Sequence, residues 1–298
     1  MPLVSVIIPA YYSYATLADC LEALRRQSRR DFEVIVINSS PEEKTRRVVE
    51  NYPEVRFEQS PDRLYPHAAR NRGVELARGE LLVFTDPDCR ARPDWLERLV
   101  AAYDAGHPVV AGAMEPASGG WFERGVHFTK FSWAMTGLPE GLHAIAPTAN
   151  VCYARRVWDI IGPFEGHLFC GDAIQSWRAA AAGFQPWFEP RAVVEHHHRG
   201  GFVSFWKERW RRSQEFEDAR IEFFRRPRWK SALLVPLMPG LLALVLGRAA
   251  ADAWRAGRLG SCLATLPVQI IGQLAWCLGE AKSRIAHAAG RWKGVLLR

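Results

Sequence analysis

The sequence predicts an α/β protein with a doubly wound, mostly parallel sheet, followed by helices of a different character. Two observations lead to this prediction. Short β-branched runs alternate with helical patterns through the first hundred residues, an order that is typical of parallel sheets. After residue 200 the pattern changes to a charged, aromatic-rich helix and then to apolar segments, which we expect to be amphipathic and membrane-associated helices.

We expect strands at the short, continuous apolar runs, because a strand that is buried on both faces has apolar residues throughout. They are residues 4–8, 32–37, 55–58 and 81–84. The helices follow from apolar side chains at helical spacing, and Gly79 is expected to end one of them. They are residues 15–28, 67–78, 172–182 and 202–224.

Charge and composition narrow the class of function. The 298 residues carry 39 Lys and Arg against 32 Asp and Glu, a net charge of +7. The basic residues become frequent after residue 199, beside aromatic and apolar stretches, which favours a membrane surface over nucleic acid as the partner. The six cysteines have no CxxC spacing, and the N-terminus has no signal peptide pattern. We therefore expect a reducing, cytoplasmic compartment.

Polar side chains follow the ends of two predicted strands. Asn38 comes after the second strand, and Asp86 and Asp88 come after the fourth. Ligands of doubly wound sheets collect at the carboxyl ends of strands, so we expect these residues in one crevice. Two carboxylates one residue apart can face a metal-bound diphosphate, and their hard oxygen atoms suit Mn²⁺ or Mg²⁺. The alternative is a solvated acidic turn that caps the next helix.

Several runs of the chain resemble the family 2 glycosyltransferases. They are VSVIIPAYYS, DFEVIVINSS, AARNRGVELARGELLVFTDPDC and TANVCYARRVWDIIGPFEGHLFCGDAIQSWRAAAAG. The resemblance covers roughly residues 3–215. It implies a GT-A fold, a nucleoside-diphosphate sugar donor and inversion at the anomeric carbon.

The resemblance also implies roles for single residues on the donor side. Asp86 corresponds to the carboxylate near the ribose, and Asp88 to the metal ligand. Arg70 could reach phosphate, and its alternative is an ordinary exposed helix arginine. Asn38 stands where an acid commonly accepts a hydrogen bond from uracil, which leaves open another mode of recognition or another base. The donor-binding residues implied are Pro9, Ala10, Tyr11, Asn38, Arg70 and Asp86.

Two further residues complete the implied site. Asp172 matches the proposed general base, which an inverting displacement needs on the face opposite the leaving diphosphate; its alternative role is a helix N-cap. Gly171 replaces the usual Glu before it, which leaves the tuning of the base open. His196 is the best match to a histidine that completes the metal shell. On an extended chain His196 and His198 point the same way, and the alternative is a surface histidine cluster.

The C-terminal third contains segments that suggest a membrane. Residues 206–210 (WKERW) resemble the QxxRW element of processive members without its glutamine, and a helix lying on the membrane explains the tryptophans equally well. The apolar block 259–279 would span roughly 31 Å, and the block 231–246 is broken by prolines. Arginines between the blocks oppose translocation. We expect shallow or re-entrant insertion rather than a spanning hairpin, and a buried helical pair in a soluble dimer is the third possibility.

The resemblance and the composition together predict how the chain is divided. Residues 1–200 are expected to form the catalytic domain, with a nucleotide-sugar half to about 112 and an acceptor half over about 113–200. An amphipathic interface helix over 201–230 and a hydrophobic, membrane-associated region over 231–298 are expected to follow.

The predicted function is an inverting, metal-dependent glycosyltransferase on the cytoplasmic face of the cell membrane. It moves a sugar from a nucleotide-diphosphate sugar to an acceptor hydroxyl, on a sugar or lipid-linked acceptor related to the cell envelope, and it has no nucleic acid partner. One alternative is a donor-binding or scaffolding protein of the same fold, suggested by Asn38 and Gly171. A nucleotidyltransferase is a second alternative, although IIPAYYSYA is not a Gly-rich phosphate loop.

Overall fold

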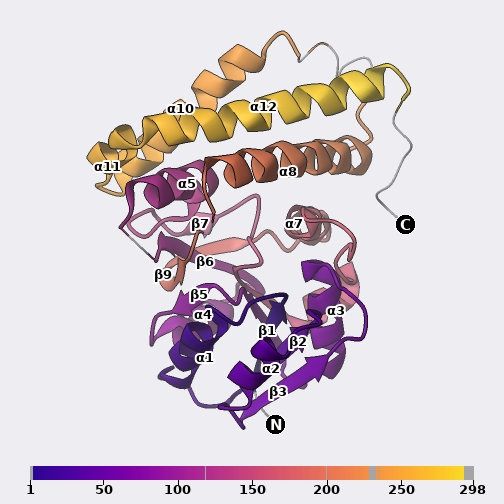
Figure 1. Cartoon of the computed structure of the whole chain (residues 1–298), viewed down its shortest axis with the longest axis vertical. Coiled ribbons are helices and arrows are strands. Elements are labelled where there is room, and N and C mark those ends of the chain that lie inside the picture. The colour runs from indigo at the N-terminus through magenta and orange to yellow at the C-terminus, as the bar shows by residue number, and fades with distance from the viewer. Residues whose placement is uncertain (1–2, 118, 199, 228–232, 234, 292–298) are drawn as a thin grey trace. The chain divides into compact units, whose positions relative to one another are not determined.

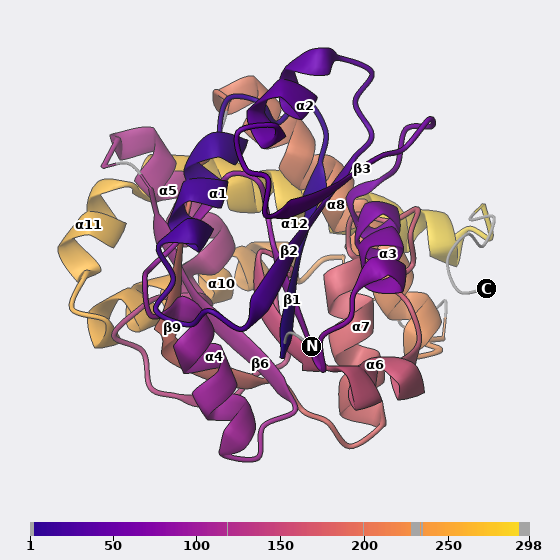
Figure 2. The same cartoon turned by 90° about the horizontal axis from the view of Figure 1, so that it is seen from below.

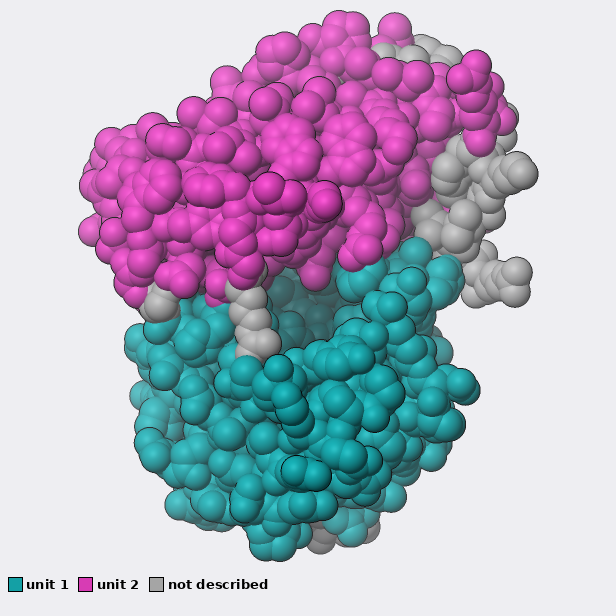
Figure 3. Space-filling model, in the orientation of Figure 1, with its two compact units in different colours: residues 1–117, 139–197 teal, residues 118–138, 198–298 magenta. Residues whose placement is uncertain are grey.

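A computed structural model describes residues 3–117, 119–198, 200–227, 233 and 235–291. The chain forms two compact units, coloured separately in Figure 3. Unit 1 comprises Met1–Ala117 and Pro139–His197, and unit 2 comprises Ser118–Leu138 and His198–Arg298. Residues 118–138 therefore belong to the compact unit that contains the C-terminal helices, although the sequence division places them in the acceptor half.

Unit 1 is built on one sheet, in which the described residues form nine strands in the order β3-β2-β1-β4-β8-β6-β9-β5, with β7 paired to β9. The strands β3, β2, β1 and β4 run parallel to one another, and β8 runs antiparallel to both β4 and β6. The α/β class and the four predicted strands are confirmed. The strands are β1 (Val4–Ala10), β2 (Phe32–Asn38), β3 (Val55–Gln59), β4 (Leu81–Thr85), β5 (Cys89–Ala91), β6 (Val109–Pro116), β7 (Gly141–Leu142), β8 (Asn150–Ala154) and β9 (Trp187–His196).

Helices cover both faces of this sheet. Figure 2 shows α1 and α4 on one side of the strands and α3 on the other; α3 packs on β1 and β2, and α4 on β6 and β9. The predicted helix spacing holds in α1, which buries Leu17, Cys20, Leu21 and Leu24. The helices of unit 1 are α1 (Leu17–Arg25), α2 (Glu43–Val49), α3 (Pro66–Leu76), α4 (Trp95–Asp104), α6 (Arg155–Ile161) and α7 (Gly171–Ala181).

The glycine after α3 has a different role from the one predicted. The helix ends at Leu76, and Ala77 is already extended, so Gly79 does not cap it. A Cβ atom on Gly79 would lie 2.7 Å from the backbone nitrogen of Ser5. The N–H of Gly79 donates a hydrogen bond of 2.8 Å to the Ser5 hydroxyl. Glycine is required here because the backbone of β1 passes too close for any side chain.

Unit 2 is helical in its described part. In Figure 1 α8 and α12 lie side by side, and α5 packs on α12. The helix predicted over 202–224 is confirmed. Residues 231, 232 and 234 of the predicted apolar block 231–246, and residues 228–230 before it, lie outside the described residues. No helix in the described part is both long and apolar enough to cross a membrane. The elements are α5 (Trp121–Phe131), η1 (Ser132–Ala134), α8 (Phe202–Phe223), α10 (Met238–Arg255), α11 (Leu259–Ala264) and α12 (Leu266–Ala288).

Replacement of Gly79 tests the close approach of β1. Gly79→Ala should lower the free energy of unfolding by about 1–3 kcal/mol, because the added methyl group must displace backbone rather than a flexible side chain. Denaturant unfolding followed by circular dichroism measures it. Gly141→Ala is the matched control, since a Cβ there meets nothing within 4 Å and the change should stay within about 0.5 kcal/mol. Equal midpoints for the two variants would contradict this explanation.

Candidate active site

The topology brings the predicted donor residues to one edge of the sheet. Strands β2, β1 and β4 are parallel neighbours, so their carboxyl ends meet at that edge. Ala10 pairs in register with Asn38, and the turn after β4 carries Asp86 and Asp88. The single crevice expected from the sequence therefore has its structural basis in the order of these three strands.

An aromatic surface lies where β1 ends. Pro9 is buried in the strand, whereas the side chain of Tyr11 is exposed and the guanidinium of Arg63 lies 4.7 Å from its ring centroid. Tyr12 has φ 51°, a left-handed conformation that bulky residues rarely adopt and that tends to occur at functional sites. An exposed ring beside a cation suits stacking with a nucleobase. Arg63 has no recognisable motif, so sequence reasoning missed it.

The side-chain amide of Asn38 forms hydrogen bonds to neighbouring residues of the protein. Its side chain is fully buried, and its amide nitrogen donates to Gln59 Oε1 at 2.8 Å. Its amide oxygen accepts from the Ser40 hydroxyl at 2.7 Å. Direct contact between Asn38 and a base would require this network to open. The role of Asn38 in donor binding stays a prediction.

Arg70 is buried, which rules out the exposed helix arginine considered from the sequence. Its Nη2 donates to Asp86 Oδ1, and its Nη1 lies 3.4 Å from Nδ1 of His67. A buried guanidinium needs such partners, because an uncompensated buried charge is strongly unfavourable. Arg70 therefore fixes the carboxylate of Asp86, and its contact with phosphate stays a prediction.

His67 connects this ion pair to helix α7. It is buried, and its ring centroid lies 4.8 Å from that of Phe164. A Cβ atom on Gly171 would lie 2.7 Å from Cδ2 of His67. The Glu that the family pattern places at residue 171 therefore has no room here, and the histidine ring fills the space that this side chain would need.

Asp172 lies in the first turn of α7, directly after this contact. The N-cap position belongs to Cys170, so the N-cap role considered for Asp172 is not observed. Oδ1 of Asp172 accepts a hydrogen bond of 2.9 Å from the N–H of Ala173. The carboxylate of Asp172 thus lies at the N-terminus of α7, which is the positive end of the helix dipole.

Asp88, Cys89 and His196 form a candidate metal centre. Oδ1 of Asp88 lies 3.7 Å from Nε2 of His196, and Cys89 pairs directly with His196 across β5 and β9. The N–H of His197 donates to the carbonyl oxygen of Asp88 at 2.9 Å. One ligand atom from each of the three residues lies within 4.8 Å of the others.

The spacing of Asp88 and His196 fits one shared ion. Two ligand atoms about 2.1 Å from a metal lie between about 3 Å and about 4.2 Å apart, and the observed 3.7 Å falls in this range. A carboxylate with an imidazole favours Mn²⁺ over Mg²⁺, which prefers oxygen alone. Burial raises the pKa of the Cys89 thiol well above its usual value. Sequence reasoning missed Cys89 because its closeness to His196 arises from strand register.

His198 and the WKERW segment belong to unit 2, whereas Asp88, Cys89 and His196 belong to unit 1. Strand β9 ends at His196, and His198 belongs to unit 2, where its Nε2 lies 3.3 Å from Nδ1 of His127. The extended strand thus ends before His198, and the direction that His196 and His198 are expected to share stays a prediction. Within unit 2, Arg209 is buried and its guanidinium lies 4.0 Å from the centroid of the Trp276 ring, which gives it a packing role.

Comparison with known sequences assigns the family. The sequence profile of glycosyl transferase family 2 matches residues 5–156. The chain belongs to this family. Glycosyltransferase AglE of Haloferax volcanii is 30% identical over 211 residues, which cover 66% of this chain and 67% of AglE. Glucosyl-dolichyl phosphate glucuronosyltransferase of the same organism is 25% identical over 183 residues, which cover 54% and 56%.

Solved structures of glycosyltransferases share the fold. The mannosyltransferase PcManGT from Pyrobaculum calidifontis, in complex with GDP-Man and Mn²⁺, has a TM-score of 0.60 at 20% identity, covering 97% of this chain and 87% of that one. Residues 1–349 of S. aureus TarS, in complex with UDP-GlcNAc, have a TM-score of 0.56 at 18% identity, covering 98% and 93%. The predicted GT-A fold is confirmed, and the enzyme is a glycosyltransferase.

Removal of the imidazole tests the metal centre of this family 2 enzyme. His196→Ala should weaken Mn²⁺ binding at least about tenfold, because one of the two well-placed ligands is lost. Electron paramagnetic resonance of free Mn²⁺ during a titration measures this loss without any need for turnover. His198→Ala is the matched control, since His198 contacts His127 in unit 2, and it should bind Mn²⁺ like the unaltered enzyme. Equal loss in both variants would refute the assignment.

Proposed function

We propose that this glycosyltransferase moves a sugar, with inversion, from a nucleoside-diphosphate sugar to an acceptor hydroxyl on a lipid-linked or cell-envelope acceptor. The proposal includes a divalent metal at Asp88 and His196 and action at the cytoplasmic face of the cell membrane. The observation that carries it is a continuous series of contacts. Asp86, Arg70, His67 and Gly171 link the donor edge of the sheet to the helix turn that carries Asp172.

On the donor side, the residues bind and orient charged groups. Tyr11 offers a ring for the base, and Arg70 holds the carboxylate of Asp86 in place for the ribose. A divalent ion held by Asp88 and His196 would neutralise the charge that develops on the departing diphosphate. These contacts fix the anomeric carbon, so that one of its faces remains open for attack.

On the acceptor side, Asp172 is the proposed general base. Its carboxylate takes the proton of the acceptor hydroxyl while that oxygen forms a bond to the anomeric carbon. The bond from this carbon to the diphosphate oxygen breaks on the opposite face, and the electron pair leaves with the nucleoside diphosphate. One displacement of this kind inverts the configuration of the anomeric carbon.

The lipid-linked acceptor is supported by one relative and by composition. The name of glucosyl-dolichyl phosphate glucuronosyltransferase specifies a lipid-linked sugar. The C-terminal half of this chain combines basic residues with apolar helices, which suits an enzyme whose acceptor resides in a membrane. The departure at Gly171 that suggested a scaffold has a packing reason in the ring of His67, so it does not argue against catalysis.

Asp172→Asn tests the role of the general base. The variant should lower kcat by about 10²–10⁴-fold, because an amide cannot accept the proton, while its oxygen can still accept the Ala173 hydrogen bond. Release of nucleoside diphosphate in the presence of acceptor measures turnover. Donor affinity should stay unchanged in the same variant. Full turnover in Asp172→Asn, or no turnover in the unaltered protein with any donor, would contradict the catalytic proposal in favour of a scaffold.

A screen of nucleotide sugars tests donor binding directly. With Mn²⁺ present, the correct donor at about 100 times its Kd should raise the free energy of unfolding by about 2.7 kcal/mol, which thermal shift detects. Donors that carry uridine, guanosine, adenosine and thymidine should be compared, because Asn38 is already bonded to Ser40 and Gln59. Asp88→Ala should remove the part of the shift that depends on Mn²⁺. The absence of a shift with every donor would count against the proposed substrate class.

A further inference from the structure

Helix α12 of unit 2 has its polar and apolar faces reversed. Four of its exposed side chains are large and apolar and recur at helical spacing, with Ile270 43%, Leu274 39%, Leu278 43% and Ile285 55% exposed. Its buried side chains include many polar and charged groups. The buried polar residues are Gln269, Gln273, Glu280, Ser283, Arg284 and His287. In a helix that faces only water on its outer side, the opposite arrangement is expected.

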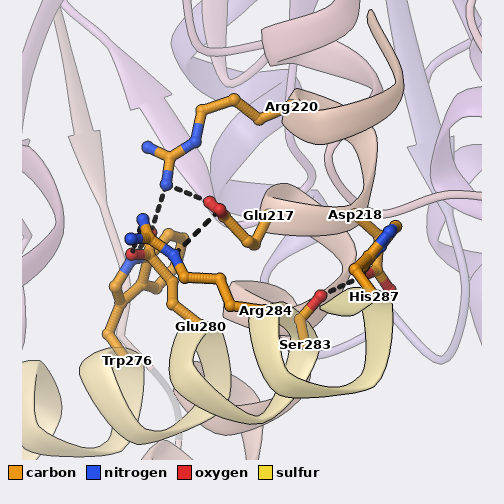
Figure 4. Close-up of polar contacts among 8 residues, drawn as sticks. All are labelled: Glu217, Asp218, Arg220, Trp276, Glu280, Ser283, Arg284 and His287. Carbon is orange, nitrogen blue, oxygen red and sulfur yellow. Dashed lines mark hydrogen bonds and ion pairs between the residues drawn. The ribbon is translucent and has the colours of Figure 1, made fainter. Parts of the chain in front are cut away.

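Ion pairs with α8 hold this orientation in place (Figure 4). Nε of Arg284 lies 2.9 Å from Oε1 of Glu217 on α8, and Nη2 of Arg220 on α8 lies 3.3 Å from Glu280 Oε1. Nε1 of Trp276 donates to Glu280 Oε1 at 2.9 Å. A rotation of α12 that buried its apolar stripe would leave these buried charges without partners, which is strongly unfavourable. The apolar stripe is therefore fixed on the outside.

A second cluster at the end of the helix gives the same orientation. Nε2 of His287 lies 3.0 Å from Asp218 Oδ1, and the hydroxyl of Ser283 donates to the same carboxylate oxygen. Asp218 lies on α8, one residue after Glu217. The two clusters pin α12 against α8 over about two turns of helix.

Helix α10 adds to the exposed apolar surface. It packs against α12, and it exposes Leu244 and Trp254, the latter by 69%. Leu263 of α11 is also exposed. A tryptophan exposed to this extent beside exposed leucines is typical of surfaces that contact a membrane interface or another protein.

The charge of the two units distinguishes between these partners. Unit 1 has 19 Lys and Arg against 24 Asp and Glu, a net charge of −5, whereas unit 2 has 20 against 8, a net charge of +12. Among the described residues of unit 2, every Asp and Glu is buried or half-buried. The exposed basic residues of unit 2 are Lys207, Arg211, Arg225, Arg226, Arg248, Arg255, Lys282 and Arg291.

Exposed apolar side chains together with exposed basic residues favour an anionic lipid surface as the partner of unit 2. A contact between two copies of this surface would bring together two units that each carry a net charge of +12, and the repulsion disfavours such a contact. An anionic bilayer supplies negative headgroups for the basic residues and an apolar layer for the side chains between them. The basic residues lie on the same helices as the stripe, with Lys282 on α12 and Arg248 and Arg255 on α10.

We propose that the outward faces of α10 and α12 bind the surface of an anionic lipid bilayer, with Ile270, Leu274, Leu278 and Ile285 inserted among the acyl chains near the headgroups. The buried charged residues between α8 and α12 fix the rotation of α12, so that these side chains face outward. The proposal specifies the membrane association included in the proposed function, and the contact itself needs neither donor, metal nor acceptor.

Vesicle flotation of the full chain tests this proposal. The chain should float with phosphatidylcholine vesicles that contain phosphatidylglycerol, and more weakly with phosphatidylcholine alone or at high salt. The triple variant Ile270→Gln, Leu274→Gln, Leu278→Gln should bind at least about tenfold more weakly. The triple variant Arg248→Gln, Arg255→Gln, Lys282→Gln should lose affinity only for the anionic vesicles. Circular dichroism and the donor-induced thermal shift show whether each variant is folded.

A matched pair of controls separates this surface from other effects. Leu142→Gln with Ile160→Gln removes two side chains of unit 1 that are 66% and 62% exposed, and it should float like the unaltered chain. Asp172→Asn should also float normally, so that failure of the transfer reaction and failure of lipid binding are separate results.

Two outcomes would overturn the proposal. The first is unaltered flotation of the apolar variant. The second is self-association of the chain that the apolar variant abolishes while vesicle binding stays the same, which would assign the stripe to a contact between copies.

Discussion

The ion pair between Arg70 and Asp86 is the interaction on which the geometry of the site depends. A buried guanidinium is unfavourable unless a charged partner and further hydrogen bonds compensate it, and Asp86 and His67 supply both. Because Asp86 begins the turn after β4, its attachment to α3 also fixes the direction in which the chain continues to Asp88. The candidate metal centre and the predicted donor edge thus depend on one buried contact.

The same contact accounts for the residues around Asp172, the proposed general base. His67 lies between Arg70 and Gly171, and its ring occupies the space that a side chain at residue 171 would need. A change from His67 would therefore disturb the support of Arg70 and the packing of α7 together. Residues that act as one unit in this way give non-additive effects when they are replaced singly or in pairs.

The sequence was sufficient to predict the strands, because apolar runs such as residues 4–8 and 81–84 are short and buried throughout. It was also sufficient to place Asn38 and Asp86 at one edge, because parallel strands end together. It could not predict the role of Gly79, which depends on how closely β1 passes. Nor could it predict that Cys89 pairs with His196, which depends on the register between β5 and β9. Local patterns carry no information about such contacts between distant segments.

The C-terminal helices show why hydropathy alone gave an incomplete account. The sequence predicts that the apolar stretch 259–279 enters a membrane, but the average hydropathy of such a stretch does not depend on which side each residue faces. In the structure Ile270, Leu274, Leu278 and Ile285 of α12 lie outside, while Glu280 and Arg284 lie inside, where Arg284 contacts Glu217. Charged groups inside a helix pair do more than hold the helices together, because they decide which face is left for contact with other molecules. Polarity and direction together, rather than polarity alone, make this surface suited to lipid.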